Sequence, residues 1–291
     1  MPKKITTAIL PVGGLGTRFL PATKSLPKEM LPIFNKPLIQ YAFEEARDAG
    51  IDKFIFITGR NKNTISNHFD HAYELESKLD EKSKKDELQK VVGWMPEAGK
   101  IAFVRQQKPL GLGHAVLCAK NFLMPDENFV VILADELLLP DPNKKGQLQL
   151  MIEKFHQQGE DCSVIGVDEV NKNEVSNYGI IKLQDDQIID MIEKPAINEA
   201  PSNLAINGRY LLSYKIFEYL EKNIIGSGGE IQLTDALKAS CKTSKFFMVK
   251  NNQQRFDCGN VLGYIEANIA FALSHNQYKD KIISSLKKYI N

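Results

Sequence analysis

Short apolar runs rich in β-branched residues alternate with amphipathic helical patterns through the first two thirds of this 291-residue chain. Such runs predict buried strands, and the longer periodic patterns between them predict helices. The expected strands are residues 5–12, 53–58, 101–105, 129–134 and 162–167, and the expected helices are residues 37–49, 112–122 and 146–158. Because strand and helix alternate, we expect an α/β fold with a mostly parallel sheet and helices on both faces.

The pattern changes at Tyr178, where shorter extended pieces begin. These pieces are residues 179–183, 187–192 and 203–212, and helical patterns follow at residues 215–222, 230–241, 260–273 and 278–290. We therefore divide the chain into an α/β core at residues 1–177, a smaller part on the same sheet at residues 178–259, and C-terminal helices at residues 260–291. Within the core, residues 61–90 are polar and carry charges of both signs, which predicts a solvated helical insertion.

The composition excludes several classes of protein. A hydrophobic fraction of 43% and a charged fraction of 25% are typical of a globular protein, and a net charge of +1 argues against a chain that coats nucleic acid. The longest apolar stretch, residues 129–134, is far shorter than the roughly 20 residues of a membrane-spanning helix. Lys3 and Lys4 precede an apolar run that leads into glycines without a small-residue cleavage pattern, so we expect a mature N-terminus. Four scattered cysteines without a CxxC pair predict the reducing cytoplasm.

A glycine-rich loop follows the first expected strand. It comprises Val12, Gly13, Gly14 and Gly16, and residues 1–36 carry six Lys and Arg residues but one acidic residue. Glycines allow backbone N–H groups to approach phosphate oxygens, so this pattern predicts a phosphate-binding loop. The loop lacks the third glycine of the dinucleotide fingerprint, where Phe19 stands, and no G-x-x-x-x-G-K-[ST] motif is present. Its distinguishing feature is a pair of cations, Arg18 and Lys28, suited to a polyphosphate.

A carboxylate follows the most apolar expected strand. Residues 129–134 stop at Asp135 and Glu136. Parallel sheets bind ligands at the carboxyl ends of their strands, and a cation that bridges phosphates prefers one or two carboxylates. We therefore expect Asp135 to bind a divalent metal, and the role of Glu136 stays open.

Four motifs together are more specific than any one alone. They are Gly14-Leu15-Gly16-Thr17-Arg18, Pro27-Lys28-Glu29-Met30-Leu31-Pro32, Gly111-Leu112-Gly113-His114-Ala115 and Glu193-Lys194-Pro195. In this order the chain resembles the sugar-1-phosphate nucleotidyltransferases over nearly its whole length. The resemblance implies a Rossmann-like mixed sheet with a smaller sugar-binding lobe that also completes the metal site. It further implies UTP and glucose 1-phosphate as substrates, Mg²⁺ as cofactor, and a homodimer or homotetramer.

The resemblance also implies roles for individual residues. The implied catalytic residues are Arg18, Lys28 and Lys194. The implied nucleotide-binding residues are Val12, Gly13, Gly14, Gly16, Gln106, Gly111 and Gly113. The implied sugar-binding residues are Gly179, Glu193, Lys194 and Asn207, and the implied metal ligands are Asp135 and Asp257. Two alternatives stay open. Gln106 and Gln107 could both be ordinary polar loop residues, and Gln106 is preferred for the base because it directly follows Arg105. Asp257 could instead cap the helix expected at Asn260. We expect His114 to be structural.

The implied reaction is attack by the phosphate of glucose 1-phosphate on the α-phosphorus of UTP, with pyrophosphate leaving. The nucleophile is already an anion, so no general base is needed, which agrees with the absence of a Ser/His/Asp or Cys/His motif. Three alternatives are a thymidylyltransferase, a sugar-nucleotide sensor without activity, and a nicotinamide dehydrogenase. Residues 61–90 and 200–205 favour the uridylyl activity, the presence of all the expected charged residues disfavours the sensor, and Phe19 disfavours the dehydrogenase.

Overall fold

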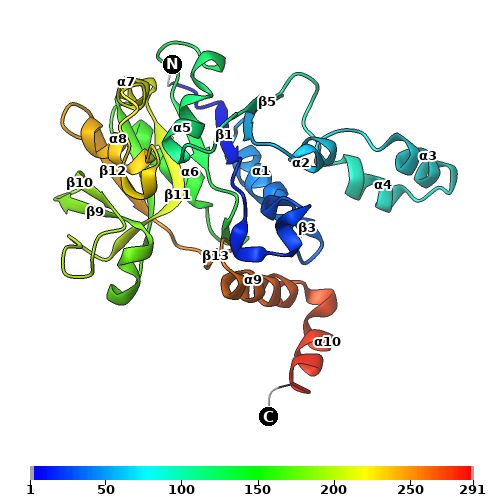
Figure 1. Ribbon diagram of the computed structural model, residues 1–291. Helices are drawn as coiled ribbons and strands as arrows, with labels where there is room; N and C mark the ends of the chain where they lie inside the picture. Colours follow the sequence, from blue (N-terminus) through cyan, green and yellow to red (C-terminus); the bar gives the residue numbers. More distant parts are fainter. Residues whose placement is uncertain (1–2, 290–291) are drawn as a thin grey trace.

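The computed structural model describes residues 3–289, which fold around one nine-stranded mixed sheet (Figure 1). The strand order is β5-β4-β1-β6-β11-β8-β12-β10-β9. The strands are β1 (Thr7–Val12), β4 (Lys53–Thr58), β5 (Ile101–Arg105), β6 (Phe129–Ile132), β8 (Cys162–Glu169), β9 (Gly179–Gln184), β10 (Gln187–Glu193), β11 (Leu204–Leu212) and β12 (Lys245–Lys250). The predicted α/β class and mixed sheet are confirmed. Met1, Pro2, Ile290 and Asn291, which fall at the ends of the predicted division, lie outside the described residues.

The sheet has a parallel half and a mixed half. Strands β5, β4, β1 and β6 pair in parallel, so their carboxyl ends share one edge. Strand β11 then runs antiparallel to both β6 and β8, while β12 runs parallel to β8. Strands β9 and β10 form an antiparallel pair at the far edge. The second part of the chain therefore continues the first sheet, as the sequence pattern predicts.

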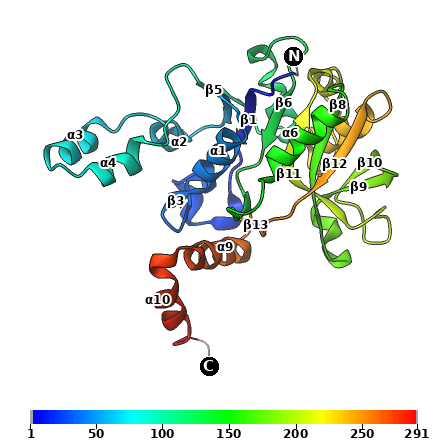
Figure 2. The same ribbon diagram turned by 180° about the vertical axis from the view of Figure 1, so that it is seen from behind.

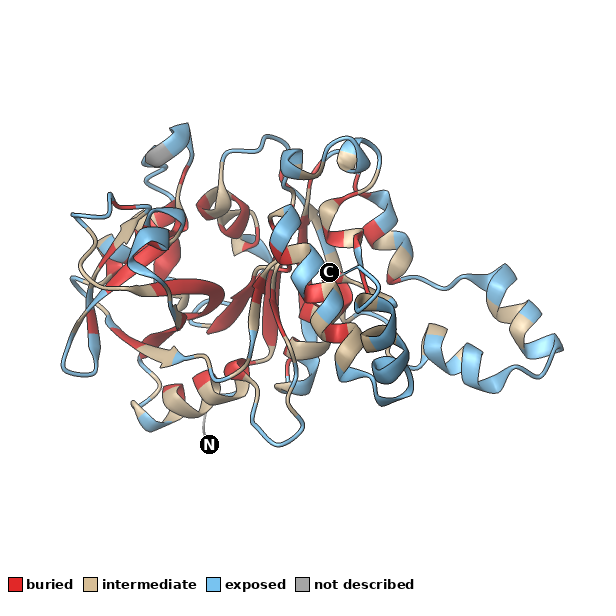
Figure 3. Cartoon of the chain, turned by 90° about the horizontal axis from the view of Figure 1, so that it is seen from below, coloured by how far each residue is buried: buried red, intermediate tan, exposed pale blue. Residues whose placement is uncertain are grey.

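Helices pack on both faces of this sheet. They are α1 (Leu38–Asp48), α5 (Leu112–Leu117), α6 (Gln147–Gln157), α7 (Phe217–Leu220) and α8 (Leu233–Ser240). Alternate residues of β1 point to opposite faces: Ile9 packs in a core with residues of α5, α7 and α8, whereas Leu10 packs with residues of α1 and α6. The buried layers on either side of the sheet are visible in Figure 3.

Two helical segments project from this body (Figures 1 and 2). The predicted insertion forms α2 (Asn63–His68), α3 (Tyr73–Glu81) and α4 (Lys85–Val92), and neither α3 nor α4 contains a buried residue. The C-terminal helices are α9 (Val261–Ser274) and α10 (Asn276–Leu286). Helix α10 thus ends before Ile290, the predicted end. No helix in the described range is long and apolar enough to span a membrane.

The structure also contains strands that the sequence pattern does not predict. They are β12 and the short pairs β7 (Glu136–Leu138) with β13 (Arg255–Asp257) and β2 (Pro32–Ile33) with β3 (Lys36–Pro37). Two or three residues are too few to show a period of two, so these short pairs give no pattern. Seven short 3₁₀ helices are also described: residues 17–19, 22–24, 28–30, 120–122, 172–177, 214–216 and 227–229.

Candidate active site

The glycine loop at the end of β1 is shaped by its contacts with Lys28. Gly16 has φ of +66°, and a Cβ there would lie 3.3 Å from the Cβ of Lys28. A Cβ on Gly14 would lie 3.6 Å from Cε of the same lysine. Val12 is fully buried, so its side chain faces the core below the loop. The absence of side chains at Gly14 and Gly16 therefore lets Lys28 lie beside the backbone of the loop.

Lys28 forms an ion pair with Asp135. Its Nζ lies 2.5 Å from Asp135 Oδ2, joining the loop after β1 to the residue that follows β6. Burial lowers the pKa of Lys28, but the attraction of Asp135 and Glu29 outweighs burial and holds that pKa above its ordinary value. Burial raises the pKa of Asp135, and the stronger combined effect of the Lys28 charge and hydrogen bond brings it below its ordinary value. Both groups are therefore charged at neutral pH.

Asp257 and Arg18 reach the same place from two other segments. A Cβ on Gly259 would lie 2.8 Å from Asp257 Oδ1 and 3.1 Å from Asp135 Oδ2, so both carboxylates face one small space. Arg18 Nη1 donates to the Gly259 carbonyl at 3.4 Å. The structure thus brings together two predicted cations and both predicted metal ligands.

The short strand pair β7 and β13 accounts for this convergence. Asp257 pairs with Glu136 in the antiparallel register, and Cys258 N–H donates to the Asp135 carbonyl at 2.7 Å. The alternative role of Asp257 as a helix cap is wrong, because Asn260 caps α9 by accepting from Gly263 N–H at 2.9 Å. Asp257 Oδ1 instead accepts from Gly259 N–H at 2.8 Å.

The two carboxylates suit Mg²⁺ better than a metal bound by protein alone. Residues 3–289 contain no group of three or more His, Cys, Asp or Glu side chains placed to hold a metal. Mg²⁺ commonly takes one or two carboxylates and completes its shell with substrate phosphate and water. Asp135 and Asp257 face one space and could provide such a pair.

Arg255 contacts Glu136, Asp168 and Tyr178, which lie in three different segments around the Asp135 and Asp257 carboxylates. Its Nη1 lies 2.8 Å from Glu136 Oε2, its Nε lies 3.2 Å from Asp168 Oδ2, and its guanidinium lies 4.9 Å from the centre of the Tyr178 ring. Burial raises the pKa of Glu136 to about 7, against the opposing charge of Arg255 and with smaller contributions from Asp257 and Asp135. Glu136, whose role the sequence leaves open, is therefore the partner of a partly buried arginine.

The predicted base-binding loop lies against the glycine loop. Gln106 is buried, with 7% of its surface exposed, and a Cβ on Gly13 would lie 3.0 Å from its Oε1. Gln107 is exposed, so Gln106 is the glutamine that faces the site. Gly111 and Gly113 are also needed for packing, because a Cβ on either residue would lie 2.8 Å from the carbonyl oxygen of Ile231.

A cavity of about 130 Å³ contains two of the four predicted sugar-binding residues, Gly179 and Glu193. It is lined by Leu112, Leu133, Glu136, Asn177, Tyr178, Gly179, Glu193, Ile206, Gly208, Tyr210, Gln232, Leu233 and Thr234. Thr234 Oγ1 donates to Glu193 Oε2 at 2.6 Å, and a Cβ on Gly179 would lie 3.2 Å from each of these two oxygens. A side chain at 179 would therefore crowd the hydrogen bond between Thr234 and Glu193.

Lys194 lies beside this cavity and is half exposed. Its Nζ is 4.0 Å from Glu193 Oε1, and its N–H donates to the Tyr178 carbonyl at 3.0 Å. Its φ of +46° is uncommon for a residue other than glycine, and such conformations concentrate at functional sites.

Asn207 is not brought to this cavity. It is fully buried, and its Nδ2 donates at 2.9 Å to both Gln147 Oε1 and Asp168 Oδ2. Strand geometry sends Asn207 and Arg209 to one face, whereas Ile206, Gly208 and Tyr210 line the cavity on the other. The side chain of Asn207 therefore faces away from this cavity.

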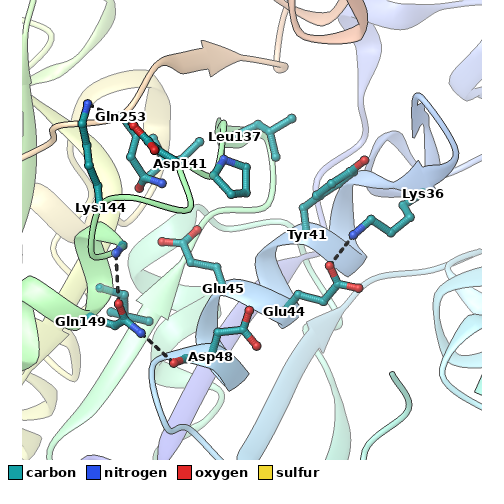
Figure 4. A pocket seen from close by; sticks show the side chains of 14 residues that line it. Lys36, Tyr41, Glu44, Glu45, Asp48, Leu137, Asp141, Lys144, Gln149 and Gln253 are labelled. Atoms are coloured by element: carbon teal, nitrogen blue, oxygen red, sulfur yellow. Dashed lines mark hydrogen bonds and ion pairs between the residues drawn. The ribbon is translucent and has the colours of Figure 1, made fainter. Parts of the chain in front are cut away.

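A separate cavity of about 250 Å³ lies between α1 and the loop after β7 (Figure 4). Glu44, Glu45 and Asp48 line it from α1, but Glu44 already pairs with Lys36 at 2.5 Å and Glu45 with Arg209 at 2.7 Å. None of the predicted site residues lines it. We assign no substrate to this cavity.

Thr234 and Arg255 have no role predicted from the sequence, although Thr234 contacts the predicted sugar ligand Glu193 and Arg255 contacts Glu136, the neighbour of Asp135. Arg255 could have been singled out from the sequence, because only six of the 37 cationic residues are arginine. The planar guanidinium group of arginine suits an ion pair with two carboxylates. Thr234 has no local signal, since its partner Glu193 is distant in sequence and only the fold brings them together.

The chain is similar to known nucleotidyltransferases in sequence and in fold. The family model described as nucleotidyl transferase matches residues 7–273. The UTP–glucose-1-phosphate uridylyltransferase of Bacillus subtilis (strain 168) is 43% identical to this chain, covering 99% of it and 98% of that protein.

Solved structures extend the similarity to the whole fold. The UTP-bound UGPase from Acinetobacter baumannii is 38% identical with a TM-score of 0.89, and the match covers 99% of this chain and 100% of that one. A UDP-glucose pyrophosphorylase complexed with UDP-glucose is 39% identical with a TM-score of 0.81, covering 94% of this chain and 100% of that one. By the extent of the family match and by identity over nearly its full length, this chain belongs to the nucleotidyl transferase family.

Proposed function

We propose that this chain transfers the uridylyl group of UTP to glucose 1-phosphate, giving UDP-glucose and pyrophosphate. The observation that carries the proposal is the convergence of two cations, Arg18 and Lys28, with the Asp135 and Asp257 carboxylates. This group of charges adjoins the sugar cavity. Glu136 follows Asp135 and pairs with Asp257, and it also lines the cavity that contains Glu193. The similarity to a uridylyltransferase and to UTP-bound and UDP-glucose-bound structures supports the choice of substrates.

The reaction follows from the charges. The phosphate of glucose 1-phosphate is an anion at neutral pH, so it attacks the α-phosphorus of UTP without a general base. Arg18 and Lys28 stabilise the negative charge that develops on the departing pyrophosphate, and Lys194 holds the incoming phosphate. Two anionic substrates are thereby brought in line, which is the main source of catalysis in phosphoryl transfer.

We assign Mg²⁺ to Asp135 and Asp257. The ion would neutralise phosphate charge, which is the chemistry that a hard divalent cation supplies at such sites. Against the effect of burial, Lys28 holds the pKa of Asp135 below its ordinary value, so this carboxylate is ionised, as a metal ligand must be.

The same site binds the sugar through hydrogen-bonding groups. Glu193 accepts hydrogen bonds from sugar hydroxyls, and the Thr234 hydroxyl, bonded to Glu193 Oε2 at 2.6 Å, orients that carboxylate. The backbone of Gly179 lies close enough to both to contact the same sugar.

The proposal is tested by measuring pyrophosphate release with glucose 1-phosphate and each of UTP, dTTP, CTP and ATP, with and without Mg²⁺. We expect release with UTP that depends on Mg²⁺. A preference for dTTP would instead support the thymidylyltransferase alternative, and no release with any nucleotide would support a sensor without activity.

We also propose that the enzyme works in the cytoplasm as a homodimer or homotetramer. The four free cysteines, Cys118, Cys162, Cys241 and Cys258, support a reducing compartment. The apolar residues Leu262, Ile265 and Ile269, exposed on α9, are compatible with association of subunits.

A further inference from the structure

The amide group of Gln106 is held in one orientation by two acceptors. Its Nε2 donates to the Gly111 carbonyl at 3.1 Å and lies 3.0 Å from His114 Nδ1. An amide nitrogen carries two hydrogens and accepts none, so Nδ1 of His114 must be the acceptor in the second bond. The ring proton of neutral His114 is therefore on Nε2.

The surroundings of His114 agree with this tautomer. Cys118 Sγ lies 3.8 Å from the same Nδ1, and burial raises the pKa of the Cys118 thiol, which keeps its hydrogen. Burial also lowers the pKa of His114, which favours the neutral ring. Two donors thus face one unprotonated nitrogen.

The orientation of the amide leaves its oxygen facing the glycine loop. Oε1 of Gln106 lies 3.0 Å from the position of a Cβ on Gly13. Within residues 3–289, no donor forms a hydrogen bond with this oxygen. The side chain therefore presents an acceptor, and not a donor, where the glycine loop and the base-binding loop meet.

A fixed acceptor distinguishes pyrimidine bases by their N3 position. Uracil and thymine carry a hydrogen on N3, whereas cytosine has a lone pair there beside an amino group. An amide with its oxygen toward the base can pair with the first two but opposes the third, and a flipped amide would do the reverse. Sites that hydrogen-bond their substrate in this way reject analogues that cannot form the bond.

We infer that His114 is a positioning residue: by accepting a hydrogen bond from Gln106 Nε2, it fixes the amide oxygen toward the base and sets the preference for UTP over CTP. This inference rests on the proposed function. It also goes beyond the structural role that the sequence predicts for His114.

The test compares kcat/KM for UTP, dTTP and CTP in the wild type and in His114→Leu. Removing the acceptor should lower the ratio of UTP to CTP by about 5- to 10-fold, the range of one lost neutral hydrogen bond. The ratio of UTP to dTTP should not change, because both bases carry N3–H. A general disturbance of the site would instead lower kcat/KM for all three nucleotides together and leave their ratios unchanged, which would contradict the positioning role.

Two further variants separate positioning from packing. His114→Asn keeps an acceptor oxygen at the place of Nδ1 and should restore the wild-type ratio, whereas His114→Ala should behave like His114→Leu and provides the same test if the leucine variant fails to fold. Cys118→Ala removes the other neighbour of Nδ1 and should leave the ratio unchanged. In a Gln106→Ala background, adding His114→Leu should change the ratio less than about twofold, since the amide it orients is gone.

The outcomes distinguish this inference from the function on which it rests. No pyrophosphate release from UTP by the wild type would overturn the proposed function. Release by the wild type together with an unchanged UTP-to-CTP ratio in His114→Leu would overturn only the role of His114. The same holds if His114→Leu lowers the ratio equally with and without Gln106.

Discussion

At the scale of single residues, the site depends on a few positions where no side chain fits. Gly259 is the clearest, because its missing Cβ leaves the space that the Asp135 and Asp257 carboxylates share with the Arg18 guanidinium. The backbone there is not in the left-handed region, so alanine can adopt it, and the effect of a methyl group should fall on the carboxylates.

Gly259→Ala should therefore lower kcat by about 10- to 100-fold, as small displacements of catalytic groups do. Steady-state kinetics at several Mg²⁺ concentrations measure this, with Gly146→Ala as control, since a Cβ there meets no atom closer than 3.9 Å. Equal kcat values in both variants would show that the two carboxylates do not share a ligand.

Lys194 should act on one substrate only. Lys194→Ala is expected to raise KM for glucose 1-phosphate by about 10-fold or more, the loss of a hydrogen bond to a charged group, with a smaller change in KM for UTP. Arg18→Ala and Lys28→Ala should instead lower kcat. If Lys194→Ala raised KM for UTP but not KM for glucose 1-phosphate, Lys194 would bind the triphosphate and the prediction would be wrong.

At the scale of elements, the long apolar strands follow from the sequence, whereas the strand pair β7 and β13 does not. Strand β6 gives an unbroken apolar run because both of its faces are covered. The three residues Arg255–Asp257 have no such pattern, and their pairing with Glu136–Leu138 depends on contacts between segments far apart in the chain. Asp257 could thus be proposed as a metal ligand only by resemblance, and its rival role as a helix cap was settled by Asn260 in the structure.

The β7 and β13 pair should depend on Arg255. Arg255→Met leaves the largely buried carboxylate of Glu136 without its cation and should lower the free energy of unfolding by about 3 kcal/mol, with a loss of kcat. Denaturant unfolding measures the first effect. Lys84→Ala, which removes an exposed ion pair to Glu87 at 3.6 Å, is the control and should change stability by less than about 1 kcal/mol. Similar losses in both variants would contradict a special role for Arg255.

At the scale of the whole molecule, the sheet and its helices form the stable body and the insertion is an appendage. Helices α3 and α4 are 9 and 8 residues long, lie outside the body and bury none of their residues (Figure 3). Helices this short are marginal without tertiary packing. The base of the insertion is different, because Phe69 and Trp94 pack together with ring centres 5.4 Å apart.

Replacing residues 73–91 with a short Gly-Ser linker should therefore preserve the fold. We expect the free energy of unfolding to change by less than about 1 kcal/mol and kcat with saturating substrates to stay within about twofold. Thermal unfolding and the pyrophosphate assay measure these quantities. A large loss of activity without loss of stability would show that the insertion contributes to catalysis.

The overall α/β architecture could be predicted because it depends on apolar patterns within single segments. The site could be predicted only in part, since Arg18, Lys28 and Asp135 stand at recognisable strand ends, whereas the partnership of Thr234 with Glu193 and of Arg255 with Glu136 arises from folding. Asn207 lies in a strand that lines the cavity, but alternate residues of β11 point to opposite faces of the sheet. The sequence alone did not show that Asn207 points away from the cavity.

The central claim is that one site holds both substrates and lets the sugar phosphate attack UTP directly. A single-turnover experiment with enzyme in excess over UTP and Mg²⁺ present, with and without glucose 1-phosphate, tests it most directly. We predict no pyrophosphate from UTP alone, and equal amounts of pyrophosphate and UDP-glucose once glucose 1-phosphate is added. Pyrophosphate released in one turnover without the sugar phosphate, or none released with it, would contradict the account.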